Sequence, residues 1–416
     1  MPPVQDLSFI QALISRNSSL LALVKFTDGR WTDLGLLTAI NDLRLCSFFS
    51  DSPPVHPVRD LANKAPFTRS RVGSLRIDAD SPEAISDEDR SKVAASFWSK
   101  IWAKRSARVT SSQFKAYLAG YSKKINNDLL STVSMEDVLS TIKSSGNSCA
   151  GPDGISFAAW RAIPEFSAKV LFGVFRAISA GQPPPRNFNK GLLFLLPKKF
   201  TGLIADTRPL SVTNTDNRIL ARTVAHKIMP SVENFIEPAQ KGFLTGRQGT
   251  DHVLDVKSFF YEGVENNIER YVFLLHTAKA FDSIDHGWIK YVLKYIGFPP
   301  WFLNFVAGVL SDVTVSPFFG KGSSISIDIE RGVKQGCPLS PLLFVIAYDP
   351  LLFFLRSRTN NEYFAFADDL ASTACKIADF YPALNLIDEF AVITGLGVNK
   401  SKSLVLSTLE EVYPVL

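Results

Sequence analysis

The sequence has few of the residues that build disulfide frameworks and zinc sites. Its 416 residues contain four cysteines and five histidines. The cysteines form no CxxC pair and no cluster with histidine, and they are Cys46, Cys149, Cys337 and Cys375. A disulfide scaffold or a structural zinc site is therefore not expected. We expect the protein to be located in a reducing compartment inside the cell, either the nucleus or the cytoplasm.

The sequence also lacks the segments that mark secretion or membrane insertion. Its opening residues, MPPVQDLSF, have neither a basic start nor an apolar run. The most apolar later segment, PLSPLLFVIAYDPLLFFLR, contains Asp349 and several prolines. It predicts a buried helix rather than a membrane span, and no membrane partner is expected.

A strong charge excess is missing as well. The chain has 45 Lys and Arg against 40 Asp and Glu, a net charge of +5. This mild basic excess is compatible with a nucleic-acid partner but does not require one. With 46% hydrophobic and 20% charged residues, the composition is that of a globular protein and excludes an intrinsically disordered one.

Two segments in the first third of the chain predict helices. ISDEDRSKVAASFWSKIWAKR has Ser86 as an N-cap, acidic residues in its first turn and basic residues at its end. Trp98 and Trp102 are four residues apart and share one face, most simply a face that packs on the core. SMEDVLSTIKSS predicts a second helix, capped by Ser134. From residue 146 onward, turns, strands and helices alternate closely.

The stretch EYFAFADDLASTA, residues 362–374, predicts a β-hairpin. Two β-prone runs flank Ala367, Asp368 and Asp369, so the tight turn would present adjacent carboxylates. Aspartate is common in turns, but here the flanks are apolar while the tip is charged. Neighbouring carboxylates repel each other unless a cation neutralises them. A pair of divalent metal ions is the simplest answer, and such a pair can activate an attacking oxygen and stabilise a leaving pyrophosphate.

A glycine-containing loop opens the apolar helix. In RGVKQGCPLSPLLF, from Arg331, the loop QGCP precedes the helical run. Glycine lets the backbone approach a ligand closely, and a helix N-terminus favours negative groups. The loop suits contact with a nucleotide, although a Gly-Cys-Pro sequence can also be an ordinary turn between two elements.

In sequence order, KAFDSIDH, RGVKQGCPLSPLLF and FADD resemble the reverse transcriptase of non-LTR (LINE-type) retrotransposons. QGCPLSPLLF is more similar to that group than to group II intron or retroviral enzymes. Other segments agree with it, namely CAGPDGISFAAW, LLFLLPKK, TRPLSVTNTDNRILARTVAHKI, QKGFLTGRQGTDHVLDV and EFAVITGLGVNKSKS. The resemblance covers about residues 146–407.

The resemblance implies an α+β, right-hand polymerase fold with fingers and palm. The palm is expected to hold an antiparallel sheet with packed helices, and the thumb to be largely absent. We predict a helical N-terminal extension over 1–125, a fingers-type region over 126–270 and the palm over 271–416. The implied activity is RNA-directed DNA synthesis, with an RNA template, a DNA primer, deoxynucleoside triphosphates and Mg²⁺, or Mn²⁺, as cofactor.

Carried over position by position, the resemblance assigns roles around the reaction centre. Asp368 matches the metal-binding aspartate of the hairpin, and Asp369 matches its neighbour. Phe281 matches the aromatic gate that excludes a 2′-hydroxyl and so selects deoxynucleotides. Gln335 and Gly336 match the loop beside the incoming nucleotide. The alternative is that these are a core phenylalanine and ordinary turn residues.

The resemblance also assigns roles to basic residues. Arg208 resembles a fingers residue near the triphosphate, and Lys402 resembles the lysine that protonates the leaving pyrophosphate. Together with Arg208, Lys198, Lys199 and Arg247 are expected to line a basic cleft that binds nucleic acid. The alternative is that they are surface cations.

One position departs from the family pattern. The family reads roughly D-x-x-KAFD, and this chain has His276 where the first aspartate binds metal. Asp282, six residues on, is expected in a helical turn that points away from the metal ions. Magnesium prefers oxygen ligands, and neutral imidazole suits zinc or copper better. The substitution also removes a negative charge from between two cations.

The sequence therefore predicts a reverse transcriptase domain of a non-LTR retrotransposon with impaired chemistry. Two alternatives stay open. One is residual polymerase activity, supported by manganese. The other is a non-catalytic nucleic-acid-binding or scaffold protein built on the polymerase fold.

Overall fold

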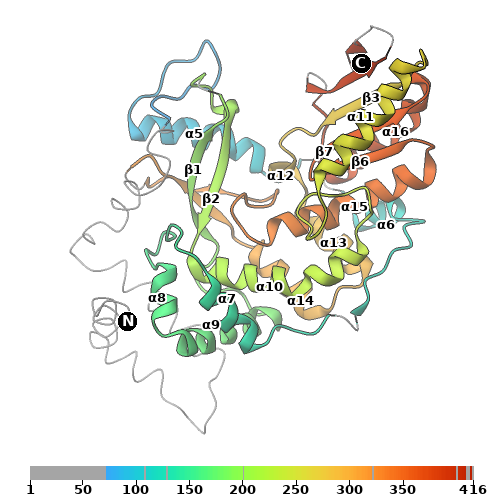
Figure 1. The fold of residues 1–416 in the computed structure, drawn as a ribbon. Coiled ribbons are helices and arrows are strands. Elements are labelled where there is room, and N and C mark those ends of the chain that lie inside the picture. Colours follow the sequence, from blue (N-terminus) through green and yellow to red (C-terminus); the bar gives the residue numbers. More distant parts are fainter. Residues whose placement is uncertain are drawn as a thin grey trace, which may run out of the picture.

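A computed structural model describes residues 72–106, 109–127, 130–199, 201–320, 323–399, 402–408 and 413–414 (Figure 1). Residues 1–71, which make up most of the predicted N-terminal extension, lie outside the described residues.

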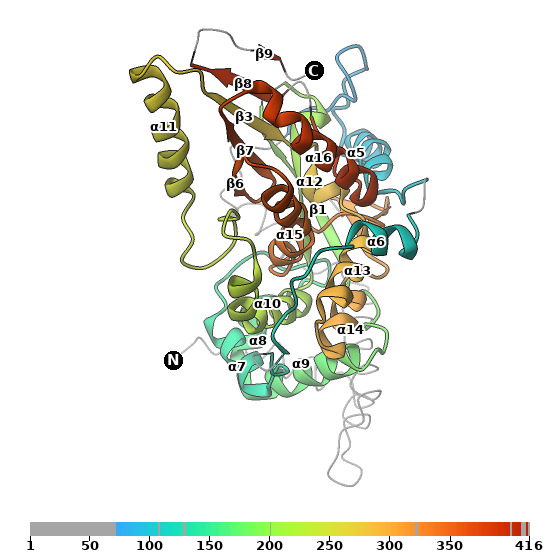
Figure 2. The same ribbon diagram turned by 90° about the vertical axis from the view of Figure 1, so that its right-hand side faces the viewer.

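Helices and strands alternate along the described chain (Figures 1 and 2). The α-helices are α5 (Asp87–Trp102), α6 (Ser111–Tyr117), α7 (Met135–Ser144), α8 (Phe157–Ala162), α9 (Pro164–Ser179), α10 (Thr215–Phe235), α11 (Gly249–Glu265), α12 (Ala280–Ser283), α13 (His286–Ile296), α14 (Pro300–Val309), α15 (Ser340–Arg358) and α16 (Phe380–Thr394). Short 3₁₀ helices are η3 (Ile204–Asp206) and η4 (Ile377–Asp379). The strands are β1 (Lys190–Pro197), β2 (Thr207–Thr213), β3 (Tyr271–His276), β4 (Thr314–Pro317), β5 (Ile327–Asp328), β6 (Glu362–Phe366), β7 (Asp369–Ala374), β8 (Leu404–Ser407) and β9 (Tyr413–Pro414).

The first sheet has the strand order β2-β1-β4-β5 within the described residues. Strands β1 and β2 form a long antiparallel pair, with Leu193 opposite Ser211. Successive side chains of a strand point to opposite faces, so Leu193 and Leu195 enter one core together with Trp98 and Trp102 of α5. Helix α5 therefore covers this face of the sheet.

The second sheet has the order β6-β7-β3-β8-β9, and its neighbouring strands are antiparallel. Strand β3 lies between β7 and β8, which buries most of its side chains. Helices α15 and α16 pack in the same core as this sheet. The mixture of helices and largely antiparallel sheets confirms the predicted α+β class.

Helix α15 is the predicted buried helix. It is apolar on all sides, which is typical of a helix enclosed by other elements. By length and composition it could cross a membrane, but 78% of its apolar window is buried inside the protein. Its first residue, Ser340, directly follows the QGCPL loop, so the predicted start of this helix is also confirmed.

The two predicted helices early in the chain are confirmed. The Ser86 hydroxyl accepts from the Asp89 N–H at 3.1 Å and caps α5. Ser134 caps α7 in the same way. The indoles of Trp98 and Trp102 stack with ring centroids 4.9 Å apart. The predicted boundaries between extension, fingers and palm remain a prediction. Strands β4 and β5, from the predicted palm range, pair in the sheet of β1 and β2.

Candidate active site

The acidic hairpin has the predicted form. Strands β6 and β7 pair antiparallel, with Phe366 opposite Asp369. Ala367, in the turn, has a φ of 58°, a left-handed conformation that alanine rarely adopts. Such a conformation persists where the surroundings enforce it, and here a buried glutamine does so.

Gln240, from the loop after α10, holds this turn. Its Oε1 accepts from the Ala367 N–H at 2.8 Å, and its Nε2 donates to the Ala367 carbonyl at 3.0 Å. The same Oε1 accepts from the Gly242 N–H at 2.9 Å. A Cβ atom on Gly242 would lie 2.4 Å from the Ala367 nitrogen, so glycine is required there. The segment QKGF thus fixes the backbone that presents Asp368.

His276 lies directly beside the hairpin. It ends β3 in register with Asp369, and its Nδ1 is 3.2 Å from Asp369 Oδ1. The Thr277 hydroxyl donates to the Asp368 carbonyl at 3.3 Å. The strand and the acidic turn therefore meet in one sheet. The histidine occupies the place that the resemblance gives to a carboxylate.

The two acidic side chains differ in environment. Asp368 is half-buried, and Asp369 is exposed. Burial raises the pKa of Asp368, and the neighbouring Asp369 raises it further, while His276 and Lys198 oppose this. Repulsion between adjacent carboxylates is the usual reason for binding a cation between them.

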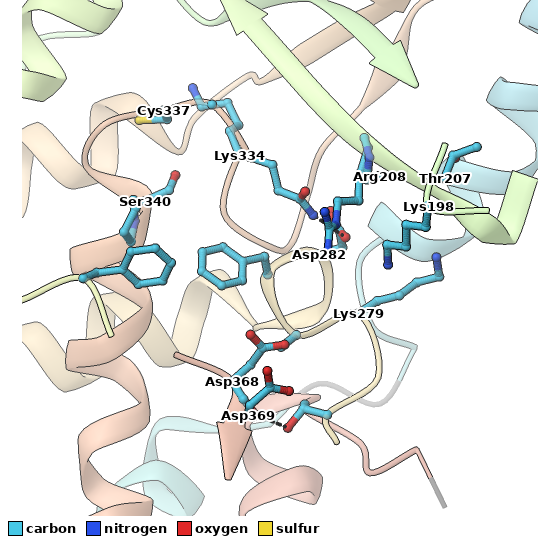
Figure 3. Close-up of a pocket in the computed structure, with 18 of the residues that line it drawn as sticks. Lys198, Thr207, Arg208, Lys279, Asp282, Lys334, Cys337, Ser340, Asp368 and Asp369 are labelled. Carbon is cyan, nitrogen blue, oxygen red and sulfur yellow. Dashed lines mark hydrogen bonds between the residues drawn. The ribbon is translucent and has the colours of Figure 1, made fainter. Parts of the chain in front are cut away.

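A pocket of about 420 Å³ opens in front of the hairpin (Figure 3). Its walls come from the end of β1, the start of β2, helix α12 and the loop before α15. The lining includes Lys198, Thr207, Arg208, His276, Lys279, Phe281, Asp282, Lys334, Gln335, Gly336, Asp368 and Asp369. Residues distant in sequence, eight of the predicted site residues among them, therefore converge on one cavity.

Four cations line this pocket. Lys198 directly follows β1, Arg208 belongs to the adjacent strand β2, and both are exposed. Burial lowers the pKa of Lys198, Lys279 and Lys334. The Lys334 ammonium donates to the Val309 carbonyl at 3.2 Å. A concave site with several cations attracts a polyanion such as a triphosphate.

The loop before α15 is docked closely on β2. The Ser211 N–H donates to the Gln335 carbonyl at 2.8 Å. Gly336 has a φ of 112°, and a Cβ atom there would lie 2.6 Å from the Ser211 carbonyl oxygen. Glycine is therefore required both for its backbone conformation and for the close approach.

Phe281 lines the pocket from α12. Its ring stacks on Phe344 of α15 at 4.6 Å between centroids. A second ring, Phe243, meets it edge-on at 5.8 Å. Phe281 is thus held from two sides and presents a rigid wall to the pocket.

Asp282 lies in the predicted helical turn, but its side chain does not leave the site. It lines the pocket, where its carboxylate accepts from Trp102 Nε1 at 3.2 Å and from Gln335 Nε2 at 3.0 Å. Burial raises the pKa of Asp282 to about 6. Both donors come from segments distant in sequence, and the expectation that Asp282 points away from the metal ions stays a prediction.

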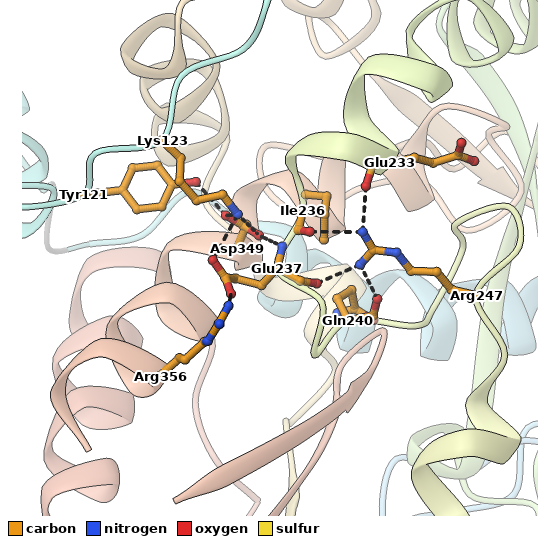
Figure 4. A network of polar contacts seen from close by, with 9 residues as sticks. All are labelled: Tyr121, Lys123, Glu233, Ile236, Glu237, Gln240, Arg247, Asp349 and Arg356. Carbon is orange, nitrogen blue, oxygen red and sulfur yellow. Dashed lines mark hydrogen bonds and ion pairs between the residues drawn. The ribbon is translucent and has the colours of Figure 1, made fainter. Parts of the chain in front are cut away.

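Three of the predicted basic residues do not line this pocket. Lys199 and Lys402 are exposed, and the charge of Lys402 acts on both Lys198 and Lys279. The Arg247 guanidinium donates to the main-chain carbonyls of Glu233, Ile236, Glu237 and Gln240 at 2.6–3.1 Å (Figure 4). Arg247 thereby holds the loop that carries Gln240.

A buried ionic network supports the same loop (Figure 4). Asp349 of α15 is fully buried and accepts from Tyr121 Oη and from the Glu237 N–H, both at 2.6 Å. The Lys123 ammonium lies 2.9 Å from Asp349 and 3.2 Å from Glu237. Donors and counter-charge offset the cost of burying Asp349.

The residues present fit a magnesium pair poorly. Asp368 and Asp369 supply carboxylate oxygens, but the third side chain beside them is the imidazole of His276. Among the described residues, no group of three or more His, Cys, Asp or Glu side chains is arranged to hold a metal ion. Magnesium needs oxygen ligands in near-octahedral geometry, and this set lacks one carboxylate.

The fold and the ordered motifs agree with a family match. A family model described as reverse transcriptase (RNA-dependent DNA polymerase) matches residues 196–412, just over half of the chain. The chain belongs to this reverse transcriptase family.

Its curated relatives come from mobile elements, which confirms the predicted resemblance to non-LTR retrotransposon reverse transcriptases. The chain is 33% identical over 212 residues to a Pol polyprotein from a type-1 retrotransposable element R2 of Popillia japonica, covering 48% of this chain and 29% of the relative. It is 29% identical over 264 residues to that of the type-2 element R2DM of Drosophila melanogaster, covering 62% and 24%. It is 27% identical over 230 residues to an uncharacterized 149 kDa protein of transposon TX1 from Xenopus laevis, covering 53% and 18%. The chain thus spans less than a third of the length of these relatives.

Four residues important for this geometry were assigned no role in the site from the sequence. They are Gln240, Lys279, Lys334 and Trp102. Gln240 stands in the QKGF segment that carries part of the family resemblance, so a signal for it was present. Trp102 precedes the matched segment.

Proposed function

We propose that this chain binds a primer–template and a deoxynucleoside triphosphate but catalyses RNA-directed DNA synthesis poorly. The observation that carries the proposal is His276, which lies in register with Asp369 at the place of a metal-binding carboxylate. A neutral imidazole there removes an oxygen ligand and a negative charge. Both are needed where a divalent cofactor stabilises developing charge.

The proposal assigns the pocket to the incoming nucleotide. Lys198, Arg208, Lys279 and Lys334 supply positive charge for the triphosphate. Phe281, held between two aromatic rings, serves as the gate against a 2′-hydroxyl. Gln335 and Gly336 form the wall on the side of helix α15. The exposed Lys402, near enough to act on Lys198, is the proton donor to pyrophosphate.

The proposal also covers the cofactor and the domains. Asp368 and Asp369 are the metal ligands, with Mg²⁺ or Mn²⁺ held more weakly than by a three-carboxylate site. Residues 1–125 form the N-terminal extension, 126–270 the fingers-type region and 271–416 the palm. Lys198, Lys199 and Arg208 contribute positive charge to the nucleic-acid surface, while the main-chain bonds of Arg247 support a structural role instead.

A reversion of the histidine tests the catalytic part of the proposal. The wild-type chain, extended by a thumb segment from a related element, is expected to show no or barely detectable primer extension with Mg²⁺. The His276→Asp variant should gain activity because it restores the missing ligand, and a further Asp368→Ala change should abolish that gain. His226→Asp, at an exposed histidine of α10, is the matched control and should stay inactive.

Two outcomes would contradict this account. If wild-type and His276→Asp chains extend a primer equally well, another residue holds the metal. If neither does, the defect lies elsewhere in the chain. Measurement with Mn²⁺ in parallel would reveal the residual activity that the alternative enzyme interpretation predicts.

A second candidate function is non-catalytic binding of nucleic acid. It is supported by the intact pairing of β3 with β7 and β8 around His276, since the substitution leaves the fold in place. We expect the wild-type chain to bind RNA with an affinity that falls as salt rises, because phosphate contacts release counterions. Filter binding at 50 and 200 mM salt measures this. Binding independent of salt, or none at 50 mM, would contradict a nucleic-acid role.

A further inference from the structure

Helix α5 reaches the pocket although it precedes the segment that matches the family. Trp98 of this helix lines the pocket. The Lys279 ammonium lies 4.6 Å from the centroid of the Trp98 ring, a distance typical of a cation–π contact. One of the pocket cations is therefore placed by an aromatic ring from upstream of the matched domain.

The end of the same helix holds the pocket carboxylate. Asp282 is 5% exposed, and a charged group so buried needs hydrogen-bond donors. Trp102 Nε1 donates to Oδ1 at 3.2 Å, and Gln335 Nε2 donates to Oδ2 at 3.0 Å. Each oxygen therefore has its own donor, which fixes the plane of the carboxylate between α5 and the loop before α15.

This arrangement determines how Gln335 is presented. Its amide nitrogen faces Asp282, so the amide oxygen is on the opposite side of the group. Its main-chain carbonyl accepts from the Ser211 N–H at 2.8 Å, so the residue is held at both ends. Loss of the Trp102 bond would free the Asp282 carboxylate to rotate and would release the Gln335 amide from its orientation.

Helix α5 is also anchored to the chain that leads into this loop. The Glu330 N–H donates to the Trp102 carbonyl at 3.0 Å. The Glu330 carboxylate accepts from the Lys104 N–H at 3.1 Å, and Arg331 Nε donates to the Ile101 carbonyl. These bonds hold the end of α5 against the chain that leads into the loop. The Trp102 indole therefore has a fixed position relative to the pocket.

We propose that Trp102, acting through Asp282, is a positioning residue of the nucleotide pocket, and that helix α5 is thereby part of that site. The inference rests on the proposed function, in which the pocket takes a deoxynucleoside triphosphate. Trp102 touches no ligand in this account. It holds the carboxylate that orients Gln335, and it belongs to a part of the chain outside the family match.

Nucleotide affinity tests the inference without requiring catalysis. The full chain is titrated calorimetrically with dTTP in the presence of Mg²⁺. Trp102→Phe keeps a buried ring and deletes the indole N–H. Trp288→Phe is the matched control, because Trp288 is also fully buried and its Nε1 also donates one bond, to the Ala347 carbonyl at 2.9 Å. Asp282→Asn and the Trp102→Phe/Asp282→Asn double variant complete a double-mutant cycle for dTTP affinity.

We expect Trp102→Phe to weaken dTTP binding about threefold to tenfold, which is less than the loss of a direct hydrogen bond to a charged group, because the Trp102 bond acts on the nucleotide only through Asp282 and Gln335. Trp288→Phe should bind as the wild type does. The double variant should bind no more weakly than Asp282→Asn, since both changes act through one carboxylate. If the losses of dTTP affinity in the two single variants simply add in the double variant, Trp102 does not act through Asp282, and the inference is overturned.

The remaining outcomes distinguish a failure of this inference from a failure of the proposed nucleotide pocket. Wild-type affinity in Trp102→Phe overturns this inference and leaves the nucleotide pocket standing. Absence of dTTP binding by the wild-type chain overturns the proposed pocket and this inference with it. If Trp102→Phe does not fold, Asp282→Asn decides, and unchanged affinity in that variant overturns the inference.

Discussion

At the scale of the residue, the site depends on backbone conformations that few side chains allow. Ala367 and Lys279 have φ values of 58° and 45°, and Gly336 has a φ of 112°. Left-handed conformations cost about 1–3 kcal/mol at residues with a side chain. Lys279 lines the pocket and Ala367 directly precedes the lining residue Asp368, so both strained residues lie at the site, whose surroundings enforce its geometry.

Gly336→Ala should destabilise the protein more than Gly154→Ala. Both glycines have positive φ. A Cβ atom at position 336 would lie 2.6 Å from the Ser211 carbonyl oxygen, whereas a Cβ atom at position 154 would have no atom within 4 Å. We expect a loss of about 1 kcal/mol for Gly154→Ala and at least about 2 kcal/mol for Gly336→Ala, because overpacking adds to the backbone strain. Urea denaturation measures both. Equal losses would show that the loop moves away from β2 without cost.

At the scale of the element, the acidic hairpin depends on a loop far away in sequence. Gln240 satisfies the N–H and carbonyl of Ala367 and the N–H of Gly242. Arg247 and the Asp349 network hold the loop from its other side. The turn that presents Asp368 is therefore stabilised by a loop that other segments of the chain hold in place.

Gln240→Leu should loosen this hairpin. It leaves three buried main-chain groups without a partner, at a cost of about 1–3 kcal/mol for each group that water does not reach. We expect hydrogen exchange at residues 365–370 to accelerate and the free energy of unfolding to fall by about 2–4 kcal/mol. Gln248→Leu, at an exposed glutamine nearby, is the control and should change neither. Unaltered exchange in Gln240→Leu would contradict the role given to this side chain.

At the scale of the whole molecule, two buried groups around one loop couple stability to pH with opposite sign. Burial lowers the pKa of His286 to about 4, and its Nε2 donates to the Gly332 carbonyl at 2.7 Å. Burial raises the pKa of Asp282 to about 6. His286 contributes stability that is full above its unfolded pKa near 6.5 and is lost as pH falls towards 4. Asp282 contributes stability that is full below its unfolded pKa near 3.8 and is lost as pH rises through 6.

Removal of either group should leave the pH dependence of stability that the other group contributes. Between pH 4.5 and 6.5, the melting temperature of Asp282→Asn should rise with pH more steeply than that of the wild type. The melting temperature of His286→Gln should rise less steeply, or fall. Differences of a few degrees are expected, since about 1 kcal/mol shifts the midpoint by ~2–4 °C in a domain of this kind. Parallel curves for all three proteins would contradict the assigned shifts.

The sequence by itself determined the family, the order of the motifs and most local elements. The alternation around Asp368, the serine caps of α5 and α7 and the apolar run of α15 act over a few residues, so they can be recognised without tertiary contacts. The sequence also identified His276 as the departure from the family pattern.

Only the tertiary structure decided which side chains meet. Trp102 and Asp282 are 180 residues apart, and Gln240 and Ala367 are 127 apart. From the sequence, Asp282 was expected to point away from the metal ions and Arg247 to bind nucleic acid, and neither expectation revealed the partners that these side chains have. Folding brought donors to the first and main-chain carbonyls to the second, because buried polar groups must find partners wherever the chain supplies them.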